Sequence, residues 1–204
     1  MSVLKVLIFA LVLSMIGGVL LYSLWGMPPI FEEPPQIKKS PGMKIIGMIS
    51  DTHVSGDAGI PRRVFEVFKD VDLIIHAGDL VQLEVLEELR EIAPVVTVYG
   101  NMDPPEVRGE LQEINSIRVH GWNIGVVHDA GLWGMGRRER IARENDFDIL
   151  VFGHTHKPFL KKRGGVWFIN PGSPTNPLPP LLVRPTVGLL IVTEEKVEPV
   201  IIRL

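Results

Sequence analysis

Seven side chains that can bind divalent metal ions occur in five groups along the chain, and each group closely follows an apolar run rich in β-branched residues. They are Asp51 and His53, Asp79, Asn101, His128, and His154 and His156. Apolar runs of this kind are typical of buried strands. Because an α/β sheet presents residues at the carboxyl ends of its strands to a common crevice, the pattern predicts one metal centre at the strand ends.

The short sequences around these side chains are more specific than the side chains alone. They are Ser50-Asp51-Thr52-His53, Ala77-Gly78-Asp79, Tyr99-Gly100-Asn101-Met102-Asp103, Val127-His128-Asp129 and Phe152-Gly153-His154-Thr155-His156. In this order the chain resembles the calcineurin-like metallophosphoesterase superfamily, and in particular its small single-domain phosphodiesterases, a branch that includes the retromer scaffold subunit. The resemblance spans residues 43–204 and includes the later segments 170–173 and 184–188. Any single residue alone would be read as a turn, cap or structural histidine.

The resemblance implies two metal ions that share one carboxylate. Asp79 lies in the middle of the set and is the expected bridge. The remaining expected ligands are Asp51, His53 and His156 for the first ion, and Asn101, His128 and His154 for the second. Asp79, Asn101 and His128 are the residues expected to act most directly in catalysis.

The chemistry of such a site follows from its donor atoms. The chain has no cysteine, so thiolate sites are excluded and the ligands are imidazole, carboxylate, amide and water. This set favours manganese, with nickel, cobalt, iron and zinc as alternatives. Two ions about 3.5–4 Å apart can hold both the attacking and the leaving oxygen of a phosphoryl displacement, and they lower the pKa of bound water toward ~7. A metal-bridging hydroxide is therefore the expected nucleophile for in-line attack.

One position departs from the pattern of the larger superfamily members. They carry a histidine directly after the Gly-Asn pair, placed to protonate the leaving oxygen, and this chain has Met102 there. A general acid typically contributes ~10²–10⁴-fold, and its absence matches the small phosphodiesterase branch. The leading hypothesis is a phosphodiesterase. The alternatives are a non-catalytic scaffold of the same fold, which would have no need for four inward histidines, and a phosphomonoesterase.

Other residues near these motifs have expected supporting roles. For Asp103, two interpretations stay open: it orients a metal-bound histidine, or it forms an ordinary Asp-Pro turn. His76 lies inside an apolar strand and is expected to be a hydrogen-bonded core residue, whereas His120 is expected at the surface. The further expectation is positive φ at three strand-end glycines, namely Gly78, Gly100 and Gly153.

The remaining sequence predicts one α/β domain. A chain of 204 residues with 46% hydrophobic and 22% charged residues fits a globular fold. Predicted strands cover 43–50, 73–77, 95–99 and 149–152, and helical spacing falls at 64–68, 85–92 and 136–145. Hairpins are predicted for 116–120 with 123–128, 159–163 with 166–169, and 186–192 with 197–203. Together they predict a two-sheet β-sandwich flanked by helices, the fold that the resemblance also implies.

The net charge of the chain limits the classes of partner that the domain is expected to bind. The chain has a formal net charge of −3, and residues 43–204 alone carry −4, because residues 1–42 hold three lysines and two glutamates. This domain lacks the basic surface of a general nucleic-acid binder. The expected partner is a small phosphodiester substrate, and assembly into a homo-oligomer stays open.

The first 42 residues are organised differently. Residues 6–25 contain no charge and are long enough to cross a bilayer as a helix. No small-residue pair marks a signal-peptide cleavage site near Trp25, so an uncleaved anchor over residues 1–26 is predicted. Residues 27–42 are rich in proline and are expected to form a semi-rigid tether to the metallophosphoesterase domain, residues 43–204.

These segments predict a single-pass membrane protein with its catalytic domain outside the cell, although lysines lie on both sides of the apolar run. The alternative is that translation starts at Met43, which begins a sequence typical of the start of the resembled family. That start would give a cytoplasmic protein.

Overall fold

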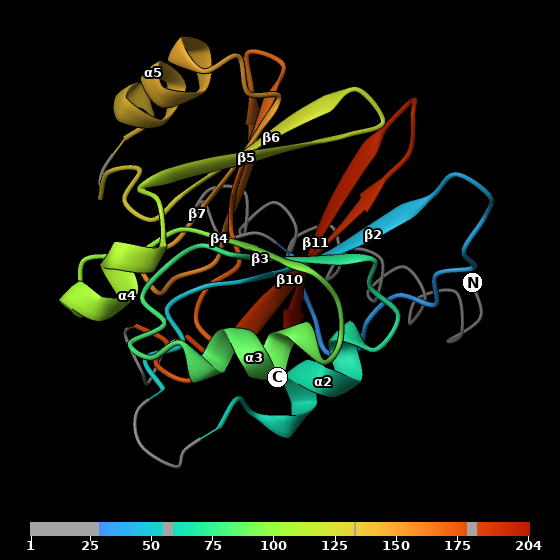
Figure 1. The fold of residues 1–204 in the computed structure, drawn as a ribbon. Coiled ribbons are helices and arrows are strands. Elements are labelled where there is room, and N and C mark those ends of the chain that lie inside the picture. Colours follow the sequence, from blue (N-terminus) through green and yellow to red (C-terminus); the bar gives the residue numbers. More distant parts are fainter. Residues whose placement is uncertain (1–28, 55–58, 133, 179–182) are drawn as a thin grey trace, which may run out of the picture.

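The computed structural model describes residues 29–54, 59–132, 134–178 and 183–204. They form two β-sheets that pack face to face, with helices on the outside, as the sequence predicted (Figure 1). The predicted anchor over residues 1–26 lies outside the described residues. In the ranges given above, no helix has the length and apolar character needed to cross a membrane.

The first sheet has six strands, in the order β1-β11-β10-β2-β3-β4. Their bounds are β1 Ile30–Phe31, β2 Lys44–Ile49, β3 Leu73–His76, β4 Val95–Thr97, β10 Thr186–Val192 and β11 Val197–Arg203. β2, β3 and β4 run parallel to one another, and β10 pairs antiparallel with β2. Two helices cover the outer face of this sheet, α2 (Arg62–Phe68) and α3 (Glu84–Arg90) (Figure 1).

The second sheet has five strands, in the order β5-β6-β7-β9-β8. Their bounds are β5 Ile114–Val119, β6 Trp122–Val127, β7 Ile149–Phe152, β8 Phe159–Arg163 and β9 Val166–Asn170. β6, β7 and β9 are parallel neighbours. Helix α5 (Gly136–Glu144) packs on the outer face, and α4 (Pro105–Glu110) lies in the connection from β4 to β5 (Figure 1).

The alternation of side chains along β2 shows how the layers are held together. Ile45 and Ile49 point to the helices α2 and α3, whereas Ile46 and Met48 point to the space between the two sheets. Both faces of the strand are buried, as is usual for a parallel strand covered on both sides. Burying one such side chain contributes about 1.5–3 kcal/mol, so the many apolar side chains buried on both faces of the sheet stabilise the fold together.

The predicted strands, hairpins and helices are confirmed to within a few residues at their ends. Two elements were not predicted. The strand β1 has only two residues, and α4 has only six, including Gly109 and the opening Pro105. Elements this short are too brief to show a hydrophobic period, so the sequence contains no pattern from which to predict them.

The proline-rich segment is in contact with the domain rather than free. β1 pairs in parallel with β11, with Ile30 opposite Ile201, and so extends the first sheet by one strand. Ile37 packs against the core beneath the helices. The sequence predicted a semi-rigid tether, and it gave no sign that part of this segment pairs with the sheet. Pairing at a sheet edge depends on distant residues that the local composition does not reveal.

Both sets of parallel strands direct their carboxyl ends to the same end of the sandwich. In the first sheet the loops that follow β2, β3 and β4 carry Asp51, Asp79 and Asn101. In the second sheet the loops after β6 and β7 carry His128 and the pair at 154 and 156. The topology therefore brings five segments that are far apart in the sequence to one place.

Candidate metal centre

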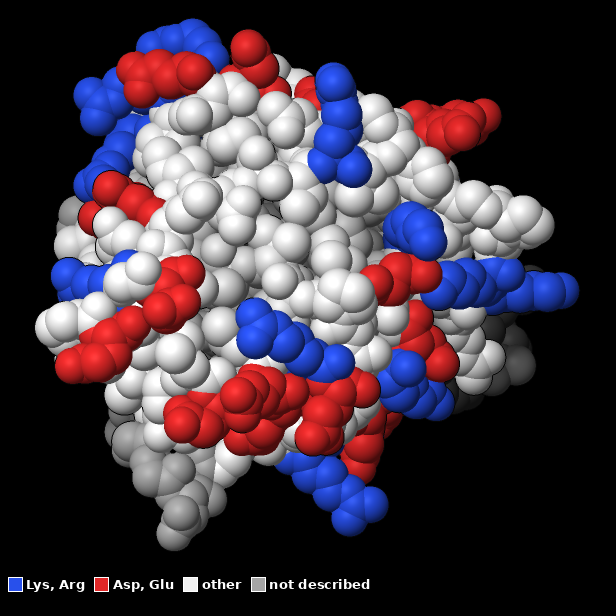
Figure 2. All heavy atoms as spheres, viewed as in Figure 1, with Lys and Arg blue, Asp and Glu red and all other residues white. Residues whose placement is uncertain are grey.

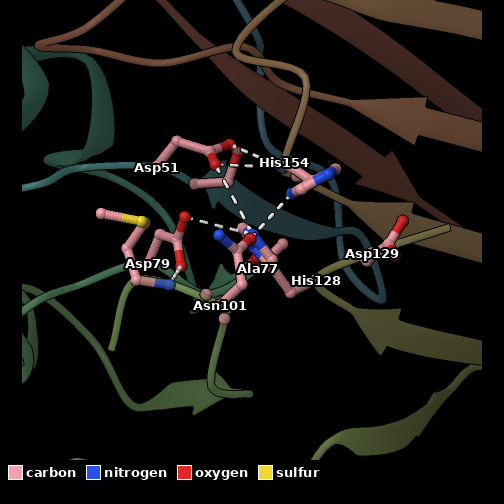
Figure 3. Close-up of polar contacts among 12 residues, drawn as sticks. Asp51, Ala77, Asp79, Asn101, His128, Asp129 and His154 are labelled. Atoms are coloured by element: carbon pink, nitrogen blue, oxygen red, sulfur yellow. Dashed lines mark hydrogen bonds and ion pairs between the residues drawn. The ribbon is translucent and has the colours of Figure 1, made fainter. Parts of the chain in front are cut away.

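All seven predicted metal-binding side chains meet in one cluster at the strand ends. Figure 3 shows five of them, namely Asp51, Asp79, Asn101, His128 and His154. One part of this cluster, which we name the first ligand group, consists of Asp51, His53, Asp79 and His156. One ligand atom from each of them lies within 4.8 Å of the others. The Nε2 atoms of His53 and His156 are 3.1 Å apart, and their rings are stacked. Ring nitrogens that approach so closely need a shared proton or a shared cation between them.

The other part, the second ligand group, consists of Asn101, His128 and His154. The Oδ1 atom of Asn101 lies 3.0 Å from Nε2 of His128 and 2.8 Å from Nδ1 of His154. Asn101 is exposed and His154 half-buried, whereas His128 is buried. This group is therefore more open than the first.

A single carboxylate oxygen connects the two groups. Asp79 Oδ2 lies 3.6 Å from His53 Nε2 and 3.2 Å from His128 Nε2. The other oxygen of Asp79 accepts a hydrogen bond of 2.7 Å from the backbone N–H of Met102, which fixes the orientation of the carboxylate (Figure 3). The geometry thus places Asp79 where a carboxylate shared by two cations would lie.

The distances fit metal binding. Two ligand atoms that bind the same ion at about 2.1 Å and at a right angle lie about 3.0 Å apart. The separations between neighbouring ligand atoms here, from 2.8 Å for His154 to Asn101 up to 3.6 Å for His53 to Asp79, fall around that value. The cluster can therefore accept divalent ions with small adjustments.

Hydrogen bonds to backbone carbonyls select the required histidine tautomers. Nδ1 of His128 donates to the carbonyl oxygen of Ala77 at 2.8 Å, and Nδ1 of His156 donates to that of Asn176 at 2.6 Å. In a neutral ring this leaves Nε2 without a proton and directed into the cluster. Partners of this kind usually orient metal-bound histidines.

Asp51 is fully buried and joins two ligand loops. It accepts a hydrogen bond of 2.7 Å from the Ser50 hydroxyl and bonds of 3.0 and 3.1 Å from the backbone N–H of His154. The loop after β2 is thereby tied to the loop after β7. These bonds fix the carboxylate before any ion binds.

Asp103 does something that neither of the two open interpretations described. Its carboxylate is buried and accepts hydrogen bonds from the backbone N–H groups of Asp79 (3.0 Å), Val81 (2.7 Å) and Gly100 (2.6 Å). It therefore fixes the backbone of the bridging aspartate and of the residue before Asn101. Among the bonds of the described residues, those of the Asp103 carboxylate go to backbone amides of the ligand loops and not to a histidine ring.

Five of the ligands have left-handed backbone conformations. Their φ angles are 53° for Asp51, 44° for His53, 58° for Asp79, 71° for His154 and 55° for His156. Positive φ is uncommon for residues other than glycine, and a sparsely populated conformation costs of order 1–3 kcal/mol. Such strain is typical of functional sites, where the surrounding structure enforces it.

The strand-end glycines partly contradict the prediction of positive φ. Gly78 has φ +85° and confirms it, but Gly100 and Gly153 are not in this region. These two positions require glycine because there is no room for a side chain. A Cβ at Gly100 would lie 2.1 Å from Oδ1 of Asp79, and one at Gly153 would lie 2.8 Å from Oδ2 of Asp51. These glycines let the backbone approach the two carboxylates.

Without bound cations, the charges of the carboxylates and imidazoles in the cluster are poorly balanced. Burial raises the pKa of Asp51 despite the opposing charges of His128 and His156. Burial also opposes the charge of Asp79, but the hydrogen bond and charge of His128 outweigh it and lower the pKa of that carboxyl. Burial lowers the pKa of His128, and its contacts with Asp79 and Asp51 more than reverse this and raise it. Buried carboxylates that compete for one imidazole provide a suitable environment for cations.

The two histidines that were not predicted to bind metal lie outside the cluster. His76 is fully buried: its Nδ1 accepts from the Gly78 amide at 3.2 Å, and its Nε2 donates to the Thr52 hydroxyl at 3.1 Å. Burial lowers the pKa of His76 to about 3, so the ring is neutral, and the predicted core role is confirmed. His120 was expected at the surface, but it is half-buried.

A set of supporting residues at the end of β9 and just after it was not predicted from the sequence. The side-chain amide of Asn170 donates to the Gly153 carbonyl at 2.7 Å and to the Thr155 hydroxyl at 3.1 Å. The Ser173 hydroxyl donates to the Asp51 carbonyl at 2.7 Å. A signal was present, since Asn170 and the residues up to 173 directly follow an apolar strand in the same way as the ligands do.

The chain is similar to known proteins along most of its length. A profile of the calcineurin-like phosphoesterase superfamily domain matches residues 43–195. A probable metallophosphoesterase of Methanocaldococcus jannaschii is 43% identical over 145 residues, which cover 69% of this chain and 73% of that protein. A phosphodiesterase of the same organism is 29% identical over 167 residues, which cover 74% of this chain and 94% of that protein.

A solved structure extends the similarity to the fold. Wild-type Vps29 of Entamoeba histolytica complexed with Zn²⁺ superposes with a TM-score of 0.64 and 28% sequence identity. The superposition covers 77% of this chain and 98% of that protein. The part of the chain with a described counterpart is thus the two-sheet domain that carries the cluster.

Proposed function

The chain belongs to the calcineurin-like phosphoesterase superfamily, and from this premise we propose that it is a binuclear metal-dependent phosphodiesterase. The proposal rests mainly on the position of Asp79 Oδ2. This oxygen lies near His53 of the first ligand group and also near His128 of the second ligand group. A shared carboxylate of this kind is what a pair of ions about 3.5–4 Å apart requires. Similarity to proteins named phosphodiesterases supports the choice of a diester over a monoester.

When bound, two divalent ions supply a water molecule acidified toward neutral pH and a clamp on the phosphoryl oxygens. The residues of the chain prepare the place for them. Asp51 and Asp79 are the two carboxylates, so two divalent ions leave the centre with net positive charge. The neutral amide of Asn101 adds a ligand without reducing that charge, and a phosphodiester anion is attracted.

The surrounding hydrogen bonds contribute rigidity. Asp103, Ser50 and the carbonyl groups of Ala77 and Asn176 hold the ligands in place before binding. A site held in this way loses little free energy to reorganisation when charge develops on the substrate. The chain thus acts mainly by positioning and electrostatics.

The proposed metal is manganese, because all seven ligand atoms are nitrogen or oxygen and their number suits octahedral sites that also keep water. The likeness to a Zn²⁺ complex of Vps29 makes zinc the first alternative. Elemental analysis of protein purified after growth with each metal, together with activity after exchange, distinguishes them.

The experiment that tests this function combines metal content with diester hydrolysis. Protein loaded with Mn²⁺ is expected to contain two ions per chain and to hydrolyse bis-p-nitrophenyl phosphate faster than p-nitrophenyl phosphate. In Asp79→Asn, both sites should weaken, and activity should fall by more than about 100-fold, since changing even the partner of a ligand costs 10–100-fold. Asp70→Asn makes the same chemical change at an exposed surface position and should leave both quantities unchanged.

Retained activity in Asp79→Asn would show that the bridge is misassigned, and preference for the monoester would favour a phosphomonoesterase. A second candidate function is supported by the likeness to Vps29, namely a protein scaffold of the same fold. The same experiment distinguishes a scaffold from a phosphodiesterase, because a scaffold would bind metal without hydrolysing either ester.

For the N-terminal region, we propose a membrane anchor followed by a docked connector. The support is the uncharged apolar run of residues 6–25 and the contacts of residues 30–39 with the domain. The proposed location is a single-pass membrane protein with the domain outside. Fractionation of cells that express the full-length chain or a chain starting at Met43 tests it: only the full-length chain should sediment with membranes, and equal solubility of both would refute the anchor.

A further inference from the structure

A cavity of about 400 Å³ adjoins the second ligand group. Asn101 and His128 are among its lining residues, so the second ligand group and the cavity share two side chains. Its lining includes residues of α4, of the start of β5 and of α5. The first ligand group contributes no residue to its lining.

The charges in the lining cancel. Three arginines, at positions 108, 137 and 140, face three acidic residues, at positions 113, 129 and 144. Arg137 already pairs with Asp129 at 3.0 Å, and Arg108 donates to the backbone carbonyls of Asn101 and Asp103. Figure 2 likewise shows basic and acidic side chains alternating over the helix α5. The cavity therefore differs from the positively charged site expected for a polyanion.

The apolar part of the lining is partly open to solvent. It consists of Ile114, Val127, Ile141 and the ring of Tyr99. Ile114 is 41% exposed, although it begins a strand of the second sheet. The Arg108 guanidinium lies over the Tyr99 ring, 5.8 Å from its centroid, and keeps that wall in place. Exposed aliphatic and aromatic surface beside a reaction centre favours binding of an apolar ring.

We propose that this cavity binds one organic substituent of the phosphoester, an uncharged aromatic or heterocyclic ring, while the phosphoryl group occupies the metal centre. The proposal rests on the proposed function and adds the class of substituent. The continuity of the cavity with Asn101 and His128 places the substituent next to the phosphoryl group. The balanced charge excludes a second phosphate as the preferred occupant, and the volume admits a ring or a pair of fused rings.

Monoesters used as competitive inhibitors test this directly, because each has a single substituent. Against hydrolysis of bis-p-nitrophenyl phosphate by the Mn²⁺-loaded full chain, phenyl and 1-naphthyl phosphate should bind at least about tenfold more tightly than methyl phosphate. 4-Carboxyphenyl phosphate should bind no more tightly than phenyl phosphate. In Ile114→Ser the preference for phenyl over methyl should fall below about threefold, whereas Phe31→Ser, which changes a comparably exposed apolar residue on β1, should keep it.

A binding measurement separates this proposal from the proposed function. Addition of 1-naphthyl phosphate should shift the NMR signals of the Ile114 and Ile141 methyl groups, and methyl phosphate should not. If the diester is hydrolysed but methyl and phenyl phosphate bind equally, or if the carboxylated ring binds best, the cavity proposal is wrong and the phosphodiesterase stands. If the ring binds and shifts these signals but no diester is hydrolysed, the proposed function fails and the cavity remains a binding site.

Discussion

Asp79 connects the two ligand groups of the candidate metal centre, but the fold surrounds the two groups differently. In the first group, Asp51 is 0% exposed and His156 8%. In the second group, Asn101 is exposed and His154 half-buried, and the group opens onto the cavity between α4 and α5. The candidate centre therefore has a closed side that fixes its geometry and an open side with room for a substrate.

The last residue of β9 and the loop after it hold the closed side in place. Ser173 and Asn170 bind the backbone of both ligand loops around Asp51 and the histidine pair, and Asn176 fixes the ring of His156. The corresponding support on the open side comes mainly from Asp103, which acts on backbone amides. The side chain of Asn101 depends on its contacts with His128 and His154 alone among the described bonds.

The largest effects are expected when one histidine is removed from each side of the centre. His156→Ala and His154→Ala should each lose one of the two ions and more than about 100-fold in activity, since ligands matter at least as much as their partners. Because His154 faces the open side, added imidazole should restore part of the activity of His154→Ala and none of that of His156→Ala. Rescue of both variants to the same extent would show that the two sides are equally accessible.

Asp103→Asn tests whether a residue without a metal contact controls the bridge. The amide presents a weaker acceptor to three backbone N–H groups, and we expect a 10–100-fold loss of Mn²⁺ affinity measured by titration calorimetry. Asp148→Asn is the matched control, because Asp148 also accepts a backbone N–H, that of Asn123 at 2.8 Å, far from the centre. Equal metal affinities in the two variants would reduce Asp103 to a residue of general stability.

Met102→His examines the missing general acid on the rim of the centre. In the wild-type protein the rate should fall steeply as the leaving group becomes more basic, because the departing oxygen is not protonated. The substitution should flatten this dependence and raise the rate on esters of alkyl alcohols by about tenfold, less than the ~10²–10⁴ of an evolved acid. A shallow dependence already present in the wild type would mean that another residue donates the proton.

His76 gives the smallest expected effect, and it concerns pH. Its pKa in the folded protein is about 3, below the ordinary 6.5, so the unfolded chain takes up a proton that the folded chain does not. Stability contributed by the neutral ring is complete above pH 6.5 and is lost as the pH falls toward 3, by at most about 1.4 kcal/mol per pH unit. The ring nitrogen signals of His76 in NMR should stay those of neutral imidazole at pH 5. Titration near pH 6.5 would contradict the buried hydrogen bonds.

The clustering of the seven candidate ligands could be predicted because each of them follows its strand within a few residues. Asp51 lies two residues after β2 and His128 directly after β6, so a local apolar run and a polar residue were enough to place them. The apolar runs, the helical spacing and the hairpin turns also predicted the sandwich. Such local signals are reliable where a strand is fully buried on both faces.

Features that depend on contacts between distant segments could not be predicted. The amides that bind Asp103 belong partly to the preceding loop, and the space that requires Gly100 is defined by Asp79, about twenty residues earlier in the chain. The cavity is formed by α4, β5 and α5 together, and β1 pairs with the last strand of the chain. None of these contacts produces a pattern within a short window of sequence.

The central claim is that Asp79 holds two ions, one in each ligand group. Anomalous diffraction from crystals of the Mn²⁺-loaded protein tests it most directly. We expect two anomalous peaks about 3.5–4 Å apart, one beside His53 and His156 and the other beside His128 and His154, with Asp79 Oδ2 between them. A single peak, or two peaks that do not share the Asp79 carboxylate, would contradict it.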